Sequence, residues 1–313
     1  MLPLFLIFAF ATSLPAVDLE AGGPPCWIQD AVSVEKNVWM MCDRGSVLAS
    51  GDFGKTWRQY PVTTQARLRA VAFLDARRGF IAGDDATLLR TEDGGQTWSA
   101  VEVPVKNDYR EIYFHGESGW LTGYGGTMLH TSDGGKTWAP QRTGTSQSIE
   151  SIYFVDHDHG WAVGWAGTIL RTTDGGTTWE EIRTPAAEWS LSGVYFRDAR
   201  EGWAVGMLGQ ILHSSDGGAT WTAIESGVKS WLRSVTVDAD GRGWITAEND
   251  LLATEDGGKT WKAVGKEGWV FLERFVRVNG ELWAVGPFGI YTKGAGPQDW
   301  TAREKFGDVR GTS

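Results

Sequence analysis

Six aspartates recur at nearly constant intervals, each opening a segment Asp-x-Gly-x-Thr-Trp in which the first x is usually glycine. They are Asp52, Asp93, Asp133, Asp174, Asp216 and Asp256. Repeated carboxylates could bind a metal or do acid–base chemistry. They could equally build a turn, in which the carboxylate accepts backbone hydrogen bonds and the glycines take positive φ. A motif that occurs once in every repeat is expected to stabilise the fold rather than to form a single functional site, so we expect the structural role.

The tryptophan that ends each segment sets the period of the chain. It stands at 57, 98, 138, 179, 221 and 261, and a degenerate seventh copy ends at Trp300. Successive positions therefore differ by 41, 40, 41, 42, 40 and 39 residues, which is the period of a four-stranded propeller blade. Within one period, residues 151–154, 160–164 and 168–172 have strand patterns, and a fourth strand starts at 178.

These patterns predict an all-β fold, a seven-bladed β-propeller of four-stranded antiparallel blades over residues 24–306. We name the strands of each blade A to D, from the channel to the rim. The first and last copies each contain all four strands, so we expect blades 1 and 7 to close the ring by packing rather than by sharing a blade. Residues 307–313 are interpreted as a C-terminal tail.

Composition and charge restrict the class of protein. The chain has 313 residues, of which 42% are hydrophobic and 22% charged, with 42 Gly and 18 Trp. Such a chain is typical of a soluble globular protein with many tight turns. The net charge of -10 argues against nucleic acid as a partner, because phosphate binding needs a basic surface.

The N-terminus carries an apolar run from 2 to 16 that is too short to span a bilayer and contains Pro3 and Pro15. We interpret residues 1–16 as a signal peptide. The mature chain is then an exported monomer without a transmembrane span, in a periplasmic, extracellular or lumenal compartment. Cys26 and Cys42 could form a disulfide there, although Cys26 precedes the first strand and the chain would have to fold back.

Aromatic residues that break the repeat indicate a binding surface. Thirteen Trp occupy repeated positions, and the other five fall in D–A or B–C connections, which this topology places on one face: Trp27, Trp165, Trp189, Trp231 and Trp269. Tyr124, Met207 and Phe288 stand at loop positions equivalent to Trp165. Trp and Tyr dominate interface energetics, although the same residues could simply plug the mouth of the channel. The Asp boxes lie on the opposite face, where we expect no partner.

Arginines also break the repeat, near the start of strand A. Counting two residues before the first core position gives, for blades 1 to 7, Asp30, Arg69, Arg110, Glu150, Ser192, Arg233 and Arg274. Four arginines would then form a basic arc beside the aromatic face, suited to carboxylates and peptide backbone. Alternatively, each arginine pairs with a loop carboxylate such as Asp84, Asp85, Glu248 or Asp250.

Residues 160–179 read Gly-Trp-Ala-Val-Gly-x-x-Gly-Thr-Ile-Leu-Arg-Thr-Thr-Asp-Gly-Gly-x-Thr-Trp. This pattern resembles the photosystem II stability and assembly factor family of Asp-box, or BNR-type, propellers. The resemblance extends over about residues 27–303 and all seven copies. It implies a soluble lumenal or periplasmic propeller that holds a membrane-protein subunit or assembly intermediate, without catalysis or a cofactor. It also implies an arginine-lined patch.

An enzyme is the alternative. Asp-box propellers include sialidases and xyloglucanases, and a glycoside hydrolase needs two facing carboxylates, for which Asp84, Asp85, Glu248 and Asp250 are candidates. Nothing in the sequence places them opposite one another, and we find no nucleotide loop, metal cluster or Ser/His/Asp order. Carbohydrate binding without catalysis remains a further alternative.

We therefore expect an exported, non-catalytic scaffold that binds a membrane or periplasmic protein, with no catalytic or metal-binding residue. The expected partner-binding residues are Arg69, Arg110, Arg233, Arg274, Tyr124, Trp165, Trp189, Trp231, Trp269 and Phe288.

Overall fold

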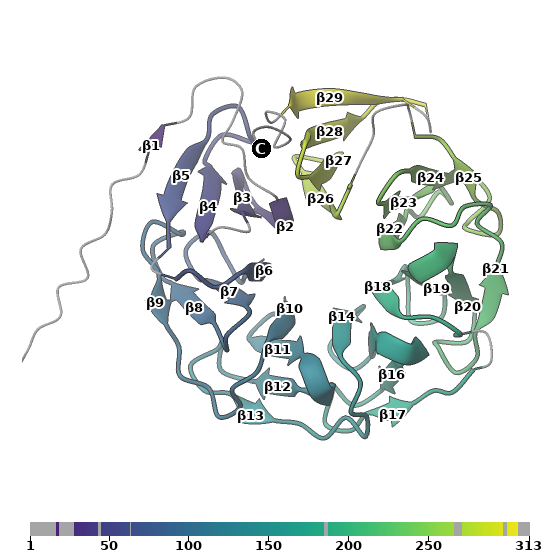
Figure 1. Cartoon of the computed structure of the whole chain (residues 1–313), viewed down its shortest axis with the longest axis horizontal. Coiled ribbons are helices and arrows are strands. Elements are labelled where there is room, and N and C mark those ends of the chain that lie inside the picture. The colour runs from purple at the N-terminus through teal and green to yellow at the C-terminus, as the bar shows by residue number, and fades with distance from the viewer. Residues whose placement is uncertain are drawn as a thin grey trace, which may run out of the picture.

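The computed structural model describes residues 17–18, 28–42, 45–62, 64–184, 187–265, 271–296 and 299–305. Seven antiparallel sheets stand in a ring around a central axis, with strand A of each blade innermost (Figure 1). The predicted seven-bladed propeller of four-stranded blades is thereby confirmed.

Each blade follows the chain outward from strand A to strand D. Blade 1 contains β2 (Ile28–Val34), β3 (Asn37–Cys42), β4 (Ser46–Ser50) and β5 (Arg58–Pro61). Blade 2 contains β6 (Leu68–Phe73), β7 (Gly79–Gly83), β8 (Leu88–Thr91) and β9 (Ser99–Ala100). Blade 3 contains β10 (Tyr109–His115), β11 (Ser118–Gly123), β12 (Met128–Thr131) and β13 (Ala139–Pro140). Blade 4 contains β14 (Ile149–Phe154), β15 (Gly160–Gly164), β16 (Ile169–Thr172) and β17 (Glu180–Glu181).

The remaining blades repeat this order. Blade 5 contains β18 (Leu191–Phe196), β19 (Gly202–Gly206), β20 (Ile211–Ser214) and β21 (Thr222–Ile224). Blade 6 contains β22 (Leu232–Val237), β23 (Gly243–Ala247), β24 (Leu251–Thr254) and β25 (Lys262–Ala263). Blade 7 contains β26 (Arg274–Val278), β27 (Glu281–Gly286), β28 (Gly289–Lys293) and β29 (Trp300–Lys305).

Aromatic stacking joins neighbouring blades. Trp161 on β15 stacks on Phe196 of β18, with ring centroids 3.4 Å apart and planes inclined by 5°, and the box residue Trp221 meets the same Phe edge-on at 5.7 Å. A Cβ at Gly202 would stand 2.4 Å from the Phe196 ring, so glycine is needed at the start of strand B. The repeated Trp therefore form the core between blades, as the period predicts.

Blades 1 and 7 close the ring by packing, as expected. Each has its own four strands, and Ile28 and Met40 of blade 1 share one core cluster with Val276 and Trp283 of blade 7. Arg303 of β29 also donates a hydrogen bond to the carbonyl of Phe53 in the blade 1 box, at 3.1 Å.

The residues before β2 bear on two expectations. A short strand, β1 (Val17–Asp18), pairs with β5 and adds a fifth strand to blade 1. Cys42 at the end of β3 is disulfide-bonded, while Cys26 lies outside the described residues. Among the described residues, no helix has the length and apolar character needed to cross a membrane.

Candidate protein-binding site on one face of the ring

The B–C loops of three blades are single 3-10 turns that lie on the same face as the D–A connections. They are η1 (Tyr124–Gly126), η2 (Trp165–Gly167) and η3 (Met207–Gly209). The backbone N–H of Trp165 donates to the carbonyl of Ser148, just before strand A of its blade, at 2.9 Å, and Met207 makes the same bond to Ser190. The structure therefore brings together the two loop classes that the topology assigned to one face.

A cavity of about 400 Å³ opens at the centre of this face, and we call it the axial cavity. All seven blades contribute to its lining, which consists of Gln29, Arg67, Arg69, Arg110, Glu150, Trp165, Ser192, Trp231, Arg233, Glu273 and Arg274. It contains the four arginines expected from the sequence and two of the expected tryptophans. Arg67 and Gln29 were missed, because they lie in the connection before strand A and in the bulge of blade 1.

The register of strand A corrects the predicted column of charged residues. In blades 2 to 6, the residue two positions before the first core position of strand A is the extra residue of a β-bulge. In blade 2, for example, it is Arg69, between Leu68 and Ala70. In blade 1 the bulge residue is Gln29, not Asp30. In blade 7, Arg274 pairs with Val285 of strand B. The equivalent pair in blade 2 is Ala70 with Ala82, directly after the bulge. Glu273 therefore occupies the bulge position of blade 7. All four expected arginines line the axial cavity, but Arg274 stands one residue further along strand A than the other three, and Glu273 takes the bulge position in blade 7.

Arg274 lies one residue further along strand A, where it forms a buried ion cluster. Its Nε lies 3.3 Å from Oδ1 of Asp30, and its Nη2 donates a hydrogen bond to Glu111. Burial raises the pKa of Glu111 to about 7 against the opposing effect of Arg274, and burial also raises the pKa of Asp30. The guanidinium of Arg274 is thus already paired with two carboxylates.

Two of the other arginines pair with loop carboxylates, as the alternative predicted. Arg69 makes a bidentate contact with Asp84 at 2.9 and 2.7 Å. Arg233 donates to Glu248 at 3.1 Å, and its Nε lies 3.6 Å from Glu273. Asp84 and Glu248, considered as catalytic carboxylates, therefore have ion-pair partners.

Hydrogen-bond donors remain without partners in the axial cavity. Nε of Arg110, Nε of Arg233 and Nε2 of Gln29 are buried, and within the described residues none has a hydrogen-bond partner. Burying an unpaired donor is unfavourable unless a ligand or water supplies an acceptor. The cavity can therefore receive carbonyl or carboxylate oxygens.

Aromatic rings hold two of these arginines in place. Arg110 lies 4.2 Å from the centroid of the Tyr124 ring and also donates to its hydroxyl, and Tyr124 meets Trp165 edge-on at 5.5 Å. On the other side of the cavity, Arg233 lies 3.9 Å from the centroid of Trp231. These cation–π contacts orient the guanidinium groups before any ligand arrives.

An apolar rim flanks the axial cavity over blades 4 and 5. Among the described residues, the exposed large hydrophobic side chains are Trp165, Trp189 and Leu208, at 42, 46 and 48%. Leu208 was not predicted to be part of this surface. It occupies the middle of η3 with a φ of 55°, where the equivalent residues are Gly125 and Ala166. The signal in the sequence was a leucine at a loop position where the other two blades have glycine or alanine, because a positive φ is strained for leucine.

One of the aromatics singled out in the sequence lies away from the axial cavity, and two are not among the described residues. Phe288 is half-buried and packs toward Phe271, with ring centroids 6.4 Å apart, and it does not line the axial cavity. Trp269 and Trp27 lie outside the described residues.

The Asp boxes have the geometry of structural turns. Asp216 accepts hydrogen bonds from the backbone N–H of Thr220 at 2.9 Å and from its hydroxyl at 2.6 Å. These two bonds lower the pKa of Asp216 to about 2. Gly217 and Gly218 both have positive φ, at 75 and 80°. Within the described residues, no group of three or more His, Cys, Asp or Glu could hold a metal ion.

A family model described as photosynthesis system II assembly factor YCF48 matches residues 50–143 and 140–307. The chain belongs to this family. The resemblance found in the sequence is thereby confirmed, and the propeller is a member of the YCF48 family.

Among curated YCF48-family relatives, photosystem II stability/assembly factor HCF136 of Cyanidioschyzon merolae is 36% identical over 76 residues, covering 24% of this chain and 17% of the relative. Photosystem II assembly lipoprotein Ycf48 of Parasynechococcus marenigrum is 32% identical over 65 residues, covering 20% of each chain. The aligned segments thus span about a fifth of these relatives.

Solved structures share the fold over most of the chain. A structure of YCF48 bound to D1 peptide has a TM-score of 0.70 at 20% identity, covering 88% of this chain and 93% of that one. Virginiamycin B lyase from Staphylococcus aureus has a TM-score of 0.74 at 14% identity, covering 87 and 96%. At these identities the likeness shows the fold alone.

Proposed function

We propose that this propeller is an exported, non-catalytic scaffold that binds a segment of a membrane protein during its assembly. The observation that carries the proposal is the axial cavity, where three buried nitrogen atoms lie near the exposed Trp165. Nε of Arg110, Nε of Arg233 and Nε2 of Gln29 have no hydrogen-bond partner among the described residues, although both arginines lie within ion-pair distance of carboxylates. Donors that need acceptors, next to a rigid aromatic anchor, are suited to a peptide backbone or an acidic side chain.

Family membership supports the class of partner. The relatives are named photosystem II assembly factors, and one solved relative is bound to a D1 peptide. The relatives from Parasynechococcus and Trichormus are named lipoproteins, which supports a periplasmic or lumenal location. We infer a membrane-protein subunit or assembly intermediate as the partner and the exported compartment as the place of binding.

A catalytic role has less support. The lyase that shares the fold is an enzyme, but at 14% identity it says nothing about chemistry here. Asp84 and Glu248 already accept hydrogen bonds from Arg69 and Arg233, so neither carboxylate faces the cavity without a partner.

Removing the exposed anchors tests the proposal. Trp165→Ala and Trp189→Ala should each weaken binding of the partner roughly 10- to 100-fold, because aromatic anchors contribute about 2 kcal/mol or more at interfaces. Binding is measured on detergent-solubilised source membranes after crosslinking, and separately with a D1 peptide by fluorescence anisotropy. Lys136→Ala on the box face is the matched control and should bind normally. Equal binding by the Trp variants and the control contradicts the proposal.

A further inference from the structure

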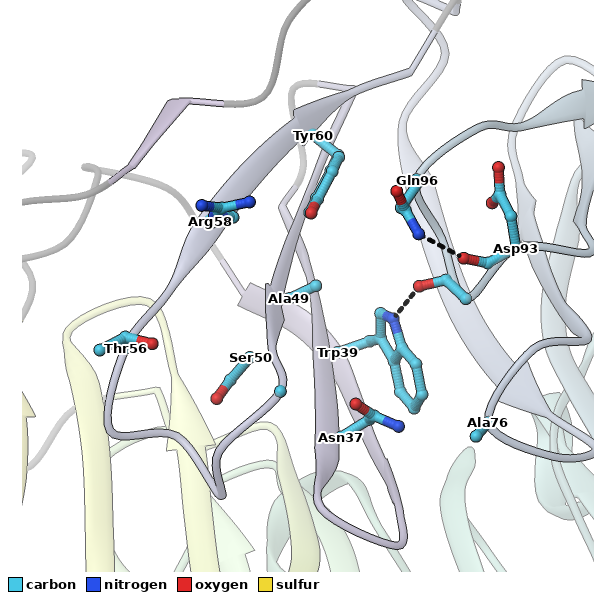
Figure 2. A pocket seen from close by; sticks show the side chains of 12 residues that line it. Asn37, Trp39, Ala49, Ser50, Thr56, Arg58, Tyr60, Ala76, Asp93 and Gln96 are labelled. Atoms are coloured by element: carbon cyan, nitrogen blue, oxygen red, sulfur yellow. Dashed lines mark hydrogen bonds between the residues drawn. The ribbon is translucent and has the colours of Figure 1, made fainter.

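A second cavity lies on the other face of the ring, between blades 1 and 2, and Figure 2 shows it from close by. It has a volume of about 460 Å³, within the range of small-molecule pockets. One wall is the outer part of blade 1, from β3 to β5, and the other is the Asp box of blade 2. We call it the interblade pocket.

The pocket is open because the side chain at position 49 is small. On strand C, Ala49 pairs with Trp39 of strand B. The same column in blades 2 to 5 carries Arg90, His130, Arg171 and His213. His213 packs on Trp203 with ring centroids 5.3 Å apart. Arg171 extends to the next box, where a Cβ at Gly217 would stand 3.7 Å from its Nη2. Ala49 leaves this space between blades 1 and 2 unfilled.

The floor of the pocket is rigid and aromatic. Trp39 stacks on Phe73 of blade 2 at 3.7 Å, and its indole Nε1 donates to the carbonyl of Gly94 at 2.9 Å. Both contacts fix the ring against the neighbouring blade. The site is therefore preformed, and a ligand would not need to order it.

The walls present neutral polar groups. Figure 2 shows Tyr60 of β5 opposite Gln96 of the blade 2 box, with Asn37 beside Trp39. Gln96 donates from its amide nitrogen to the carbonyl of Asp93 at 3.0 Å, which leaves its amide oxygen as an acceptor. The side-chain amide of Asn37 both donates and accepts, as does the Tyr60 hydroxyl. The half-buried Tyr60 ring adds an apolar face.

The charges of the pocket do not suit an anion. The carboxylate of Asp93 accepts hydrogen bonds from Thr97 and Thr91 within its own box. It therefore remains ionised near Arg58, the one cation among the residues that line the pocket. A phosphate site needs an excess of positive charge or a cluster of free backbone N–H groups.

We propose that the interblade pocket binds a neutral pyranose sugar. Vicinal hydroxyls each donate and accept, which matches the amides of Asn37 and Gln96, and the C–H face of a pyranose can pack on Tyr60. The free sugar and the end of a polysaccharide share this chemistry. The site lies on the face opposite the axial cavity, so it is independent of the protein-binding function.

Filling the pocket tests the proposal. Ala49→Arg restores the larger side chain that Arg90 and Arg171 supply in other blades, and Ala253→Arg places the same side chain in the same column of blade 6 as a matched control. Saturation-transfer NMR is recorded with maltotetraose, cellotetraose and chitotetraose. We expect transfer to at least one sugar with the wild type and with Ala253→Arg, and at least a tenfold weaker affinity with Ala49→Arg. Co-sedimentation with insoluble cellulose and chitin distinguishes a polysaccharide from a free sugar.

Two further variants keep the test decisive. Tyr60→Phe removes only the hydroxyl and should weaken the sugar affinity severalfold, even if Ala49→Arg does not fold. Trp165→Ala should bind sugar as the wild type does, so failure here is distinguishable from failure of the protein-binding proposal. The absence of transfer to all three sugars, or unchanged affinity in both Ala49→Arg and Tyr60→Phe, would overturn the proposal.

Discussion

Arg274 on β26 of blade 7 donates a hydrogen bond to Glu111 on β10 of blade 3, and these strands stand on opposite sides of the central axis (Figure 1). The same guanidinium lies 3.3 Å from Asp30 of blade 1, which in turn accepts the backbone N–H of Val71 in blade 2. One buried cation thus links four of the seven blades, including the pair that closes the ring. This cluster makes the stability of the ring dependent on pH.

Removal of the cation should destabilise the fold more at high pH than at low pH. Arg274→Met leaves two buried carboxylates unpaired at pH 8, and breaking a buried ion pair in this way costs about 3–5 kcal/mol. At pH 5 the loss should be smaller, because raised pKa values let Glu111 and Asp30 take up protons. Guanidinium unfolding at the two pH values measures the difference. Equal destabilisation at both would contradict the cluster.

Glu111→Gln should remove part of the pH dependence of the wild type. The folded pKa of Glu111, about 7, lies above the ordinary value of 4.5 for a glutamate, so its contribution to the free energy of unfolding decreases as pH rises from about 4.5 to about 7. Glutamine keeps the size and a carbonyl acceptor for Arg274 but cannot ionise. Urea unfolding across this window should show a flatter profile for the variant. A variant that loses stability with pH as steeply as the wild type would rule out Glu111 as the titrating group.

The Asp boxes should affect acid stability and leave partner binding unchanged. Asp216→Ala removes three accepted hydrogen bonds in an exposed turn, for which we expect a loss of about 1 kcal/mol. The folded pKa of Asp216, about 2, lies below the ordinary value of 3.8 for an aspartate, so this contribution is present above pH 4 and is lost as pH falls toward 2. Thermal melts at pH 7 and pH 2.5 should therefore differ between variant and wild type at pH 7 and converge at pH 2.5. Loss of partner capture by Asp216→Ala would show that the box face takes part in binding.

The sequence predicts most of the fold because each repeat carries the same strand patterns and the same Asp-box turn. The box Trp fix the number of blades, and strand order alone assigns Trp165 and Trp231 to one face. The register of strand A was missed in blades 1 and 7, because a β-bulge adds a residue without leaving a mark in the hydrophobic pattern. Because of this one-residue error the ion cluster of Arg274 was not predicted, although Arg274 does line the axial cavity.

Contacts between distant blades could not be predicted from the sequence. Glu111 and Arg274 are 163 residues apart, and no local pattern pairs them. The interblade pocket was also missed, although its signal was available: Ala49 breaks a column in which four blades carry Arg or His. A comparison of every repeat position, not only the aromatic ones, would have found it.

The central claim is that a protein partner docks on the face of the axial cavity and not on the Asp-box face. Photo-crosslinking tests this most directly, with p-benzoylphenylalanine placed at position 165 or 208 on the apolar rim and at position 136 in a box. After irradiation in solubilised source membranes, the adducts are identified by mass spectrometry. The account predicts an adduct with the same membrane protein from 165 and from 208, and none with it from 136. An adduct with that protein from 136 alone, or equal adducts from both faces, would contradict it.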